Sequence, residues 1–308
     1  GSEMCIRDSM AIAFHKNYNS PSQIVKLLQD RGLIIEDITS AIKDLINIGY
    51  YRFSAYLYPF LATPKDAQIF KPQSKFETAL SLYHFDQSLR SMVFNEIAGI
   101  EVAIRSALAN IVAKETGNKF WMTDASTYRN QDRFLKTMAV IDKELNGSRE
   151  EFIEHFKYKY SNPYPPAWML VEILPMGVLN HIYNNMADNA LRKKIAAHFS
   201  LTAPVFSSWL TIIILTRNVC CHHARVWNKE NAIPPVEPRR MTVPWITSAP
   251  TTRRFYFNLC IIKYFLDRIS GKNDFTHRLQ NLLTTYPMVD NRAMGFPQQW
   301  RNEPLWRD

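Results

Sequence analysis

Apolar residues recur at steps of three and four along most of the chain, a spacing typical of helices that bury one face. The pattern predicts helices at 21–30, 37–48, 76–90, 129–145, 149–158 and 255–269. The longest stripe consists of Val93, Ile97, Ile100, Ile104, Leu108 and Ile111. Only 9 of the 308 residues are glycine, which suits helices better than a turn-rich β protein. We therefore predict an all-α fold.

Prolines mark where the helical pattern breaks. A polar loop with two prolines spans residues 62–75, and five prolines fall between residues 233 and 250. We expect an N-terminal helical module over residues 10–75 and a larger helical domain over residues 76–308, with a docked C-terminal tail. Residues 1–9 are interpreted as a non-native leader, with the native chain starting at Met10.

Charge and cysteine content narrow the partner and the compartment. The formal net charge of +9 favours a polyanionic partner, of which RNA or DNA is the leading candidate. Beyond the leader, Cys220, Cys221 and Cys260 make no disulfide framework, which predicts a reducing cytoplasm. No apolar run reaches the ~18 residues of a membrane span, so no membrane partner is expected.

The most unusual segment is 216–228, where polar residues close the long apolar run 205–215. Buried charge and imidazole are costly unless they are paired or used. On a continuous helix the segment divides into two stripes. One predicts a core face and consists of Trp209, Ile213, Thr216, Cys220, His223 and Trp227; the other predicts a site and consists of Thr211, Asn218, His222 and Arg225.

The pattern Arg217-Asn218-x-x-x-His222 resembles the RNxxxH signature of HEPN ribonucleases, small all-helical domains that cut RNA without metal. The longer string RNVCCHHARVWN resembles the Abi-like group of that superfamily, the abortive-infection proteins of the AbiD/AbiF type. The segments YYRFSAYLYPF, IEVAIR and PPAWMLVEILPMG are further similarities, so the resemblance extends from Tyr18 to Trp306. It implies a HEPN-type helical bundle and a bacterial RNase toxin of phage defence.

Metal-independent RNA cleavage needs a base for the 2′-OH, a cation for the crowded phosphorane and an acid for the leaving 5′-oxygen. Histidine titrates near neutral pH and serves in either proton role, so His222 is the predicted acid/base. Arg217 is the predicted phosphate clamp, Asn218 orients His222 from one helical turn away, and Arg225 adds positive potential. The expected products are a 2′,3′-cyclic phosphate and a 5′-hydroxyl, with no cofactor.

Three further residues have two interpretations each. In the Abi-like resemblance Glu101 and Arg105 lie on the helix facing the motif, where Glu101 would orient Arg217 or a histidine and Arg105 would bind phosphate. Alternatively, they form an ordinary ion pair four residues apart. His223 is a second catalytic candidate, or a packed core histidine.

Zinc is the rival chemistry for Cys220-Cys221-His222-His223. Consecutive helical residues fan out by about 100° each, so four in a row cannot form one tetrahedral site. Only Cys220 and His223 could share a metal, and no second ligand pair is evident. We therefore expect no metal.

A single helix does not bring Arg217 and His222 to one phosphate, because residues five apart lie about 140° around the axis. HEPN ribonucleases pair two such helices, so a homodimer with a composite active site is expected. The resemblance also implies a bound small noncoding RNA, as substrate or antitoxin.

Two other functions stay open at this point. One is an RNA-binding protein that holds a noncoding RNA with little turnover; the other is a purely structural helical protein. The aromatic segment 50–60 likewise has two interpretations, as a surface that stacks on unpaired bases or as core.

Overall fold

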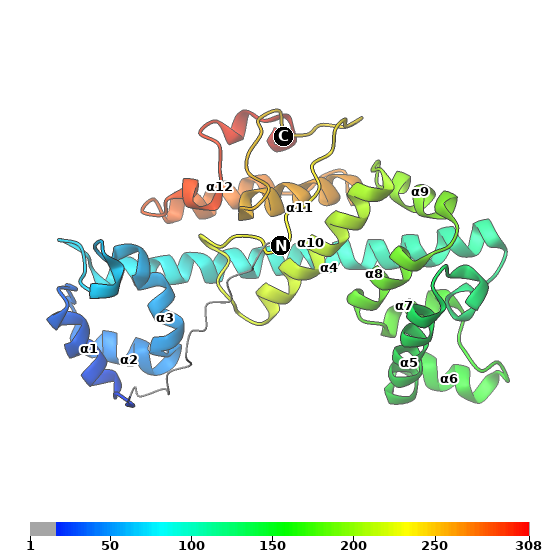
Figure 1. Cartoon of the computed structure of the whole chain (residues 1–308), viewed down its shortest axis with the longest axis horizontal. Helices are drawn as coiled ribbons and strands as arrows, with labels where there is room; N and C mark the ends of the chain where they lie inside the picture. Colours follow the sequence, from blue (N-terminus) through cyan, green and yellow to red (C-terminus); the bar gives the residue numbers. More distant parts are fainter. Residues whose placement is uncertain (1–16, 308) are drawn as a thin grey trace, which may run out of the picture. The chain divides into compact units, whose positions relative to one another are not determined.

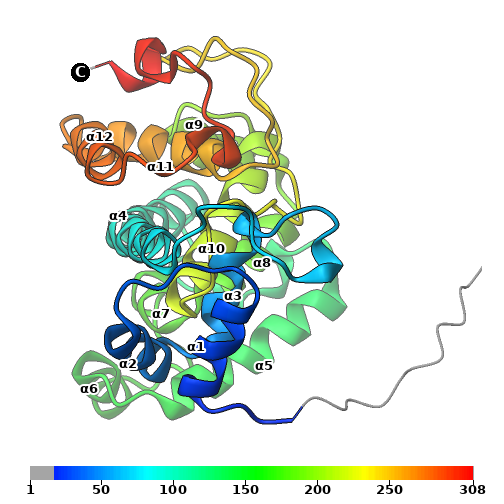
Figure 2. The ribbon, with the colours of Figure 1, turned by 90° about the vertical axis from the view of Figure 1, so that its left-hand side faces the viewer.

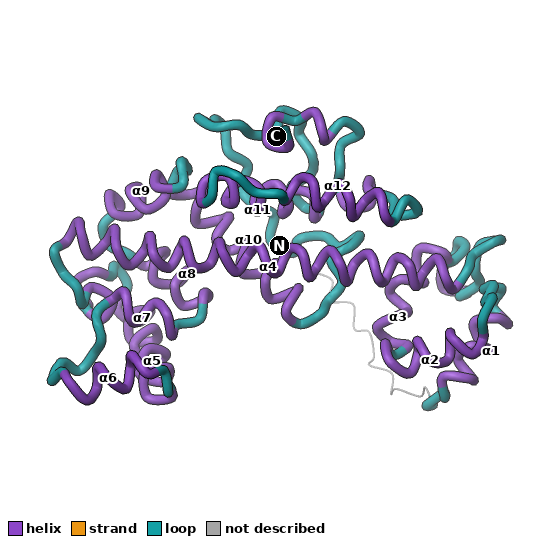
Figure 3. The backbone as a smooth tube through the Cα atoms, turned by 180° about the vertical axis from the view of Figure 1, so that it is seen from behind, coloured by secondary structure: helices purple, strands orange, loops and turns teal. Residues whose placement is uncertain are grey.

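The computed structural model describes residues 17–307, so the predicted leader at residues 1–9 lies outside the described part. Within that part the chain forms twelve α-helices, several 3-10 turns and isolated β-bridges, without a strand (Figure 3). The predicted all-α fold is confirmed. The chain divides into two compact units, one ending at Tyr83 and one starting at His84.

The N-terminal unit contains α1 (Pro21–Asp30), α2 (Ile38–Ile48), α3 (Tyr50–Leu57) and the first turns of α4. Ser20 caps α1 in a capping box with Gln23, and Pro21 begins the helix. Gly49 separates α2 from α3 and has a φ of 80°, a backbone conformation that favours glycine. The core of this unit includes Ile24, Val25, Leu28, Leu45, Phe53, Phe70 and Phe76.

The second unit is built on α4 (Phe76–Thr116). The helix begins in the N-terminal unit, and its part from His84 onward belongs to the second unit. Because Phe76 and Ala79 belong to the N-terminal core, the boundary between units falls inside this 41-residue helix rather than at the expected 75/76. The other helices are α5 (Gln131–Gly147), α6 (Glu151–Lys159), α7 (Ala167–Ile173), α8 (Met176–Asn185), α9 (Asn189–His198), α10 (Ala203–Cys221), α11 (Phe255–Ile269) and α12 (Phe275–Thr285). Figure 1 shows α11 and α12 running along the direction of α4, and Figure 2 views all three nearly end-on.

α10 lies at the centre of the second unit and packs against α8, α9 and α11. Trp209 is fully buried, lies 4.9 Å from the Trp245 ring, and donates its indole N–H to the Val236 carbonyl at 2.9 Å. The same tryptophan therefore holds the loop between α10 and α11.

The expectation that no apolar segment reaches membrane-span length needs a correction. Among the described residues, α10 is the one helix that is long and apolar enough to cross a membrane, judged by length and composition alone. Its apolar residues, from Val205 through Ile213, are largely buried against protein, as in the core helix of a bundle.

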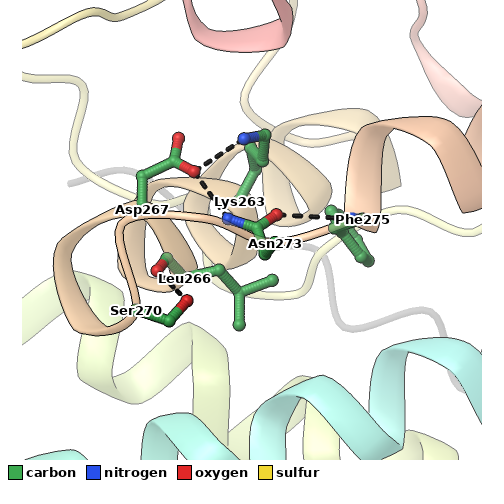
Figure 4. Close-up of polar contacts among 6 residues, drawn as sticks. All are labelled: Lys263, Leu266, Asp267, Ser270, Asn273 and Phe275. Carbon is green, nitrogen blue, oxygen red and sulfur yellow. Dashed lines mark hydrogen bonds and ion pairs between the residues drawn. The ribbon is translucent and has the colours of Figure 1, made fainter. Parts of the chain in front are cut away.

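The turn between α11 and α12 is held by side chains rather than by glycine alone (Figure 4). Asp267 accepts from the buried Lys263 at 2.6 Å and from the Asn273 amide at 2.8 Å. Asn273 in turn accepts from the Phe275 N–H at 3.3 Å. The buried ammonium is thus paired, and the Asn273 side chain satisfies the N–H of the first residue of α12.

The C-terminal tail packs against the second unit through Trp300, Leu305 and Trp306, which are all buried. Glu303 joins the tail to the α10–α11 loop by accepting from Thr247 and Ser248. Burial opposes ionisation of Glu303, but these hydrogen bonds outweigh it and hold the pKa of the carboxyl below its ordinary value.

Candidate active site

The helix that carries the motif ends inside it. α10 stops at Cys221, His222 is the C-cap residue, and His223 adopts a left-handed backbone conformation at φ 55°. The His222 and Ala224 N–H groups donate back to the carbonyls of Asn218 and Val219, at 3.0 and 2.9 Å. The two stripes predicted on a continuous helix are therefore right only as far as Cys220.

This early end corrects the interpretation of His223 as a packed core histidine. His223 is exposed, because the chain turns away from the helix axis at this residue. Val226 and Trp227 are buried, but they do not lie on α10. They belong to residues 224–228, which follow the turn at His223 and are called the returning segment below.

A buried carboxylate that the sequence analysis missed holds the returning segment. Asp86, on α4, is fully buried and accepts from the N–H groups of Val226 and Trp227 at 3.1 and 2.6 Å. Arg90, one turn further along α4, forms an ion pair with the same carboxylate. The only available signal was the Asp-x-x-x-Arg spacing in FDQSLR, which also suits an ordinary surface pair.

Arg217 lies beside Glu101 of α4, with 3.6 Å between Nε of the arginine and Oε1 of the carboxylate. The Glu101 side chain is 15% exposed, and the same oxygen has no hydrogen bond among the described residues. The Arg217 guanidinium also lies 6.0 Å from the ring of Phe94. Arg217 itself is 41% exposed, so it can contact a ligand while the carboxylate holds one edge of it.

Arg105 is placed differently from its predicted role. Its guanidinium donates to the backbone carbonyls of Val171 and Leu174, the latter at 2.7 Å. Burial lowers the pKa of Arg105 from its ordinary value. Arg105 thus ties α4 to the C-terminal end of α7, and part of its donor fork is used before any phosphate arrives.

The remaining motif residues gather around the C-terminal end of α10. Asn218 is exposed, and its side-chain oxygen Oδ1 lies 3.5 Å from Nη1 of Arg217. His222 is exposed one turn beyond Asn218, and Arg225 is half-buried on the returning segment. The fold therefore places a guanidinium, an amide and an imidazole near the C-terminal end of α10, with the Glu101 carboxylate of α4 next to the guanidinium.

The cysteines are not arranged as a metal site. Cys220 is buried, which raises the pKa of its thiol to about 12, whereas Cys221 is exposed. Across residues 17–307, no cluster of three or more His, Cys, Asp or Glu side chains could hold a metal ion.

Comparison with known proteins gives one result. A family model described as Abi-like protein matches residues 43–228, a range that includes every motif residue from Glu101 to Arg225. Neither curated proteins nor solved structures gave a match.

Proposed function

Because the chain belongs to the Abi-like family, whose name points to abortive infection and phage defence, we propose that it is a metal-independent HEPN-type endoribonuclease. The observation that carries the proposal is the Arg217–Glu101 ion pair, which involves the arginine of the motif whose histidine, His222, is exposed at the end of α10. This arrangement supplies a fixed cation and a proton-transfer group without a cofactor.

In the proposed reaction, the Arg217 guanidinium binds the non-bridging oxygens of the scissile phosphate and stabilises the phosphorane charge. His222, whose imidazole is oriented by the Asn218 side chain, takes the proton of the 2′-OH as the 2′-oxygen attacks phosphorus. A proton is then given from histidine to the 5′-oxygen as the bond between phosphorus and that oxygen breaks. The products are a 2′,3′-cyclic phosphate and a 5′-hydroxyl.

We propose that a second copy of the chain completes the site. Arg217 points toward Glu101 on α4, whereas His222 lies about 140° further around α10, so one motif does not enclose a phosphate. The exposed stripe of α4 beside Glu101 carries no charge, which suits close packing of a second helix. It consists of Ser91, Asn95, Ala98, Gly99, Val102, Ser106 and Asn110.

The Gly99→Arg variant is expected to be monomeric and to lose cleavage activity. A Cβ at Gly99 meets nothing within 4 Å, so the substitution leaves the protomer intact while adding a charge to the proposed contact. Light scattering after gel filtration should give about twice the chain mass of 35.9 kDa for the wild type and one chain mass for the variant.

The matched control is Gly147→Arg, because Gly147 on α5 is also exposed with open space around it. This control should remain dimeric and active. A monomeric wild type that cleaves RNA, or a dimeric Gly99→Arg variant, would exclude the composite site on this face.

The nuclease proposal is tested by incubating the protein with end-labelled single-stranded RNA in EDTA. We expect cleavage, with fragments that end in a 2′,3′-cyclic phosphate and begin with a 5′-hydroxyl. Fragments with 5′-phosphates, or cleavage only after Mg²⁺ is added, would contradict the mechanism. Tight RNA binding without cleavage would favour the alternative, a stable complex with a noncoding RNA.

A further inference from the structure

We propose that one face of the N-terminal unit binds single-stranded RNA through two exposed tyrosines and two neighbouring lysines. This surface, the tyrosine face, consists of Tyr51, Arg52, Tyr58, Lys65 and Lys71. The inference rests on the proposed function only in taking RNA as the ligand of the chain.

The aromatic segment 50–60 divides between core and surface. Phe53 and Tyr56 are buried in the N-terminal unit. Tyr51 is 95% exposed and Tyr58 is 54% exposed, although burial of an aromatic ring is strongly favourable. The core interpretation therefore holds for Phe53 and Tyr56, but the core does not account for Tyr51 and Tyr58.

The spacing of the two rings favours unpaired bases. Tyr51 lies in the first turn of α3, and Tyr58 directly follows the last residue of α3. They are seven residues apart, which corresponds to two turns and about 10 Å along a helix axis. Stacked bases are only about 3.4 Å apart in one strand of a duplex. Each tyrosine would thus stack on a separate base of an extended strand, and this kind of stacking tolerates different sequences.

Two lysines are held next to Tyr58 by the loop that follows α3. The Lys65 ammonium lies over one face of the Tyr58 ring, 4.2 Å from its centre, and donates to the Tyr58 carbonyl at 2.7 Å. A base would therefore stack on the opposite face of this ring. The Lys71 ammonium donates to the neighbouring Pro59 carbonyl at 3.0 Å. Each ammonium has three donors and uses one in these bonds, so donors are left for a phosphate.

The electrostatics of this loop agree with an anionic ligand. Partial burial and then the nearby charge of Lys71 lower the pKa of Lys65 from its ordinary value. A phosphate beside the two ammonium groups would relieve this repulsion. Asp66 is the one carboxylate between residues 61 and 71. Cations beside exposed rings match the combination that single-stranded nucleic acid recognises.

The test measures binding of the full chain to a fluorescent 2′-O-methyl RNA, which lacks the attacking hydroxyl and cannot be cleaved by the proposed mechanism. The double variant Tyr51→Ala/Tyr58→Ala should bind this single strand roughly 25-fold or more weakly, since each lost stacking contact costs about fivefold or more. The matched control is Tyr18→Ala, because Tyr18 is 86% exposed in the same unit. It should bind like the wild type.

The lysines give an independent readout. Replacing Lys65 and Lys71 by glutamine should reduce the slope of log affinity against log salt by about 1.4, or 0.7 for each lost phosphate contact. The tyrosine double variant should keep the wild-type slope. The charge-matched control is the double variant Lys26→Gln/Lys43→Gln, which replaces two exposed lysines on α1 and α2. It should keep the wild-type affinity for the single strand and the wild-type salt slope.

Single-strand affinity within about twofold of the wild type for the tyrosine double variant would overturn the inference, and normal RNA binding would then point to a protein partner for this face. Stronger binding of duplex than of single strand would also overturn it. A wild type that binds RNA through the tyrosines but never cleaves it would disprove the nuclease and leave this inference standing. If the wild type cleaves RNA and the tyrosine double variant binds it as tightly as the wild type, the nuclease proposal stands and this inference fails.

Discussion

Replacing His222 by alanine is expected to lower the rate of RNA cleavage by about 10²- to 10⁴-fold, the usual contribution of a positioned proton-transfer group. His222 is exposed at the end of α10, so its removal creates no cavity and should leave the thermal unfolding temperature nearly unchanged. Single-turnover cleavage of labelled RNA with enzyme in excess measures the chemical step directly. RNA affinity, measured with the uncleavable analogue, should change little.

The neighbouring histidine supplies the control for this prediction. His223 has a φ of 55°, which glycine adopts without strain, so His223→Gly removes the imidazole and keeps the turn. We expect less than about a tenfold loss of rate, because His223 lies five residues after Asn218 and past the end of α10, so the Asn218 side chain does not orient it. If His223→Gly inactivates the enzyme and His222→Ala does not, the two roles must be exchanged.

Replacing Asp86 by alanine is expected to destabilise the second unit by about 3–5 kcal/mol, the typical cost of removing one partner of a buried ion pair. The side chain is fully buried, and its loss removes the ion-pair contact with the buried Arg90 and the acceptor of the Val226 and Trp227 N–H groups. The free energy of unfolding should be measured by urea titration, followed by tryptophan fluorescence.

The comparison variant is Glu154→Ala, which breaks the exposed ion pair with Lys157 on α6. Exposed pairs contribute about 0–1 kcal/mol, so this variant should unfold close to the wild type. If Asp86→Ala costs no more than Glu154→Ala, the carboxylate is not what holds the returning segment against α4.

The helices could be predicted because an apolar stripe is a local property of the sequence. The stripe from Val93 to Ile111 is buried along almost its whole length, as its spacing requires. The end of α10 could not be predicted, because it depends on a histidine in a conformation that usually indicates glycine. Without that signal, periodicity continued the helix through His223 to Trp227.

The site could be predicted only in part. The resemblance predicted that Glu101 lies on a helix facing the motif, and Glu101 does lie next to Arg217 in space. The catalytic roles of Arg217 and His222 stay predictions. The partners of Arg105 are backbone carbonyls, which exist at every position and leave no trace in the side-chain sequence. Asp86 binds backbone N–H groups 140 residues away, and a single sequence contains no record of such a contact.

The contact between Arg217 and Glu101 also bears on how fast the site can work. An unrestrained arginine loses side-chain entropy whenever it grips a ligand, and that loss weakens binding. In the proposed nuclease, the nearby carboxylate and the Phe94 ring would restrict the guanidinium before RNA binds. Part of the cost of ordering Arg217 would then be met on folding rather than in each turnover, which would leave more of the binding energy to stabilise the transition state.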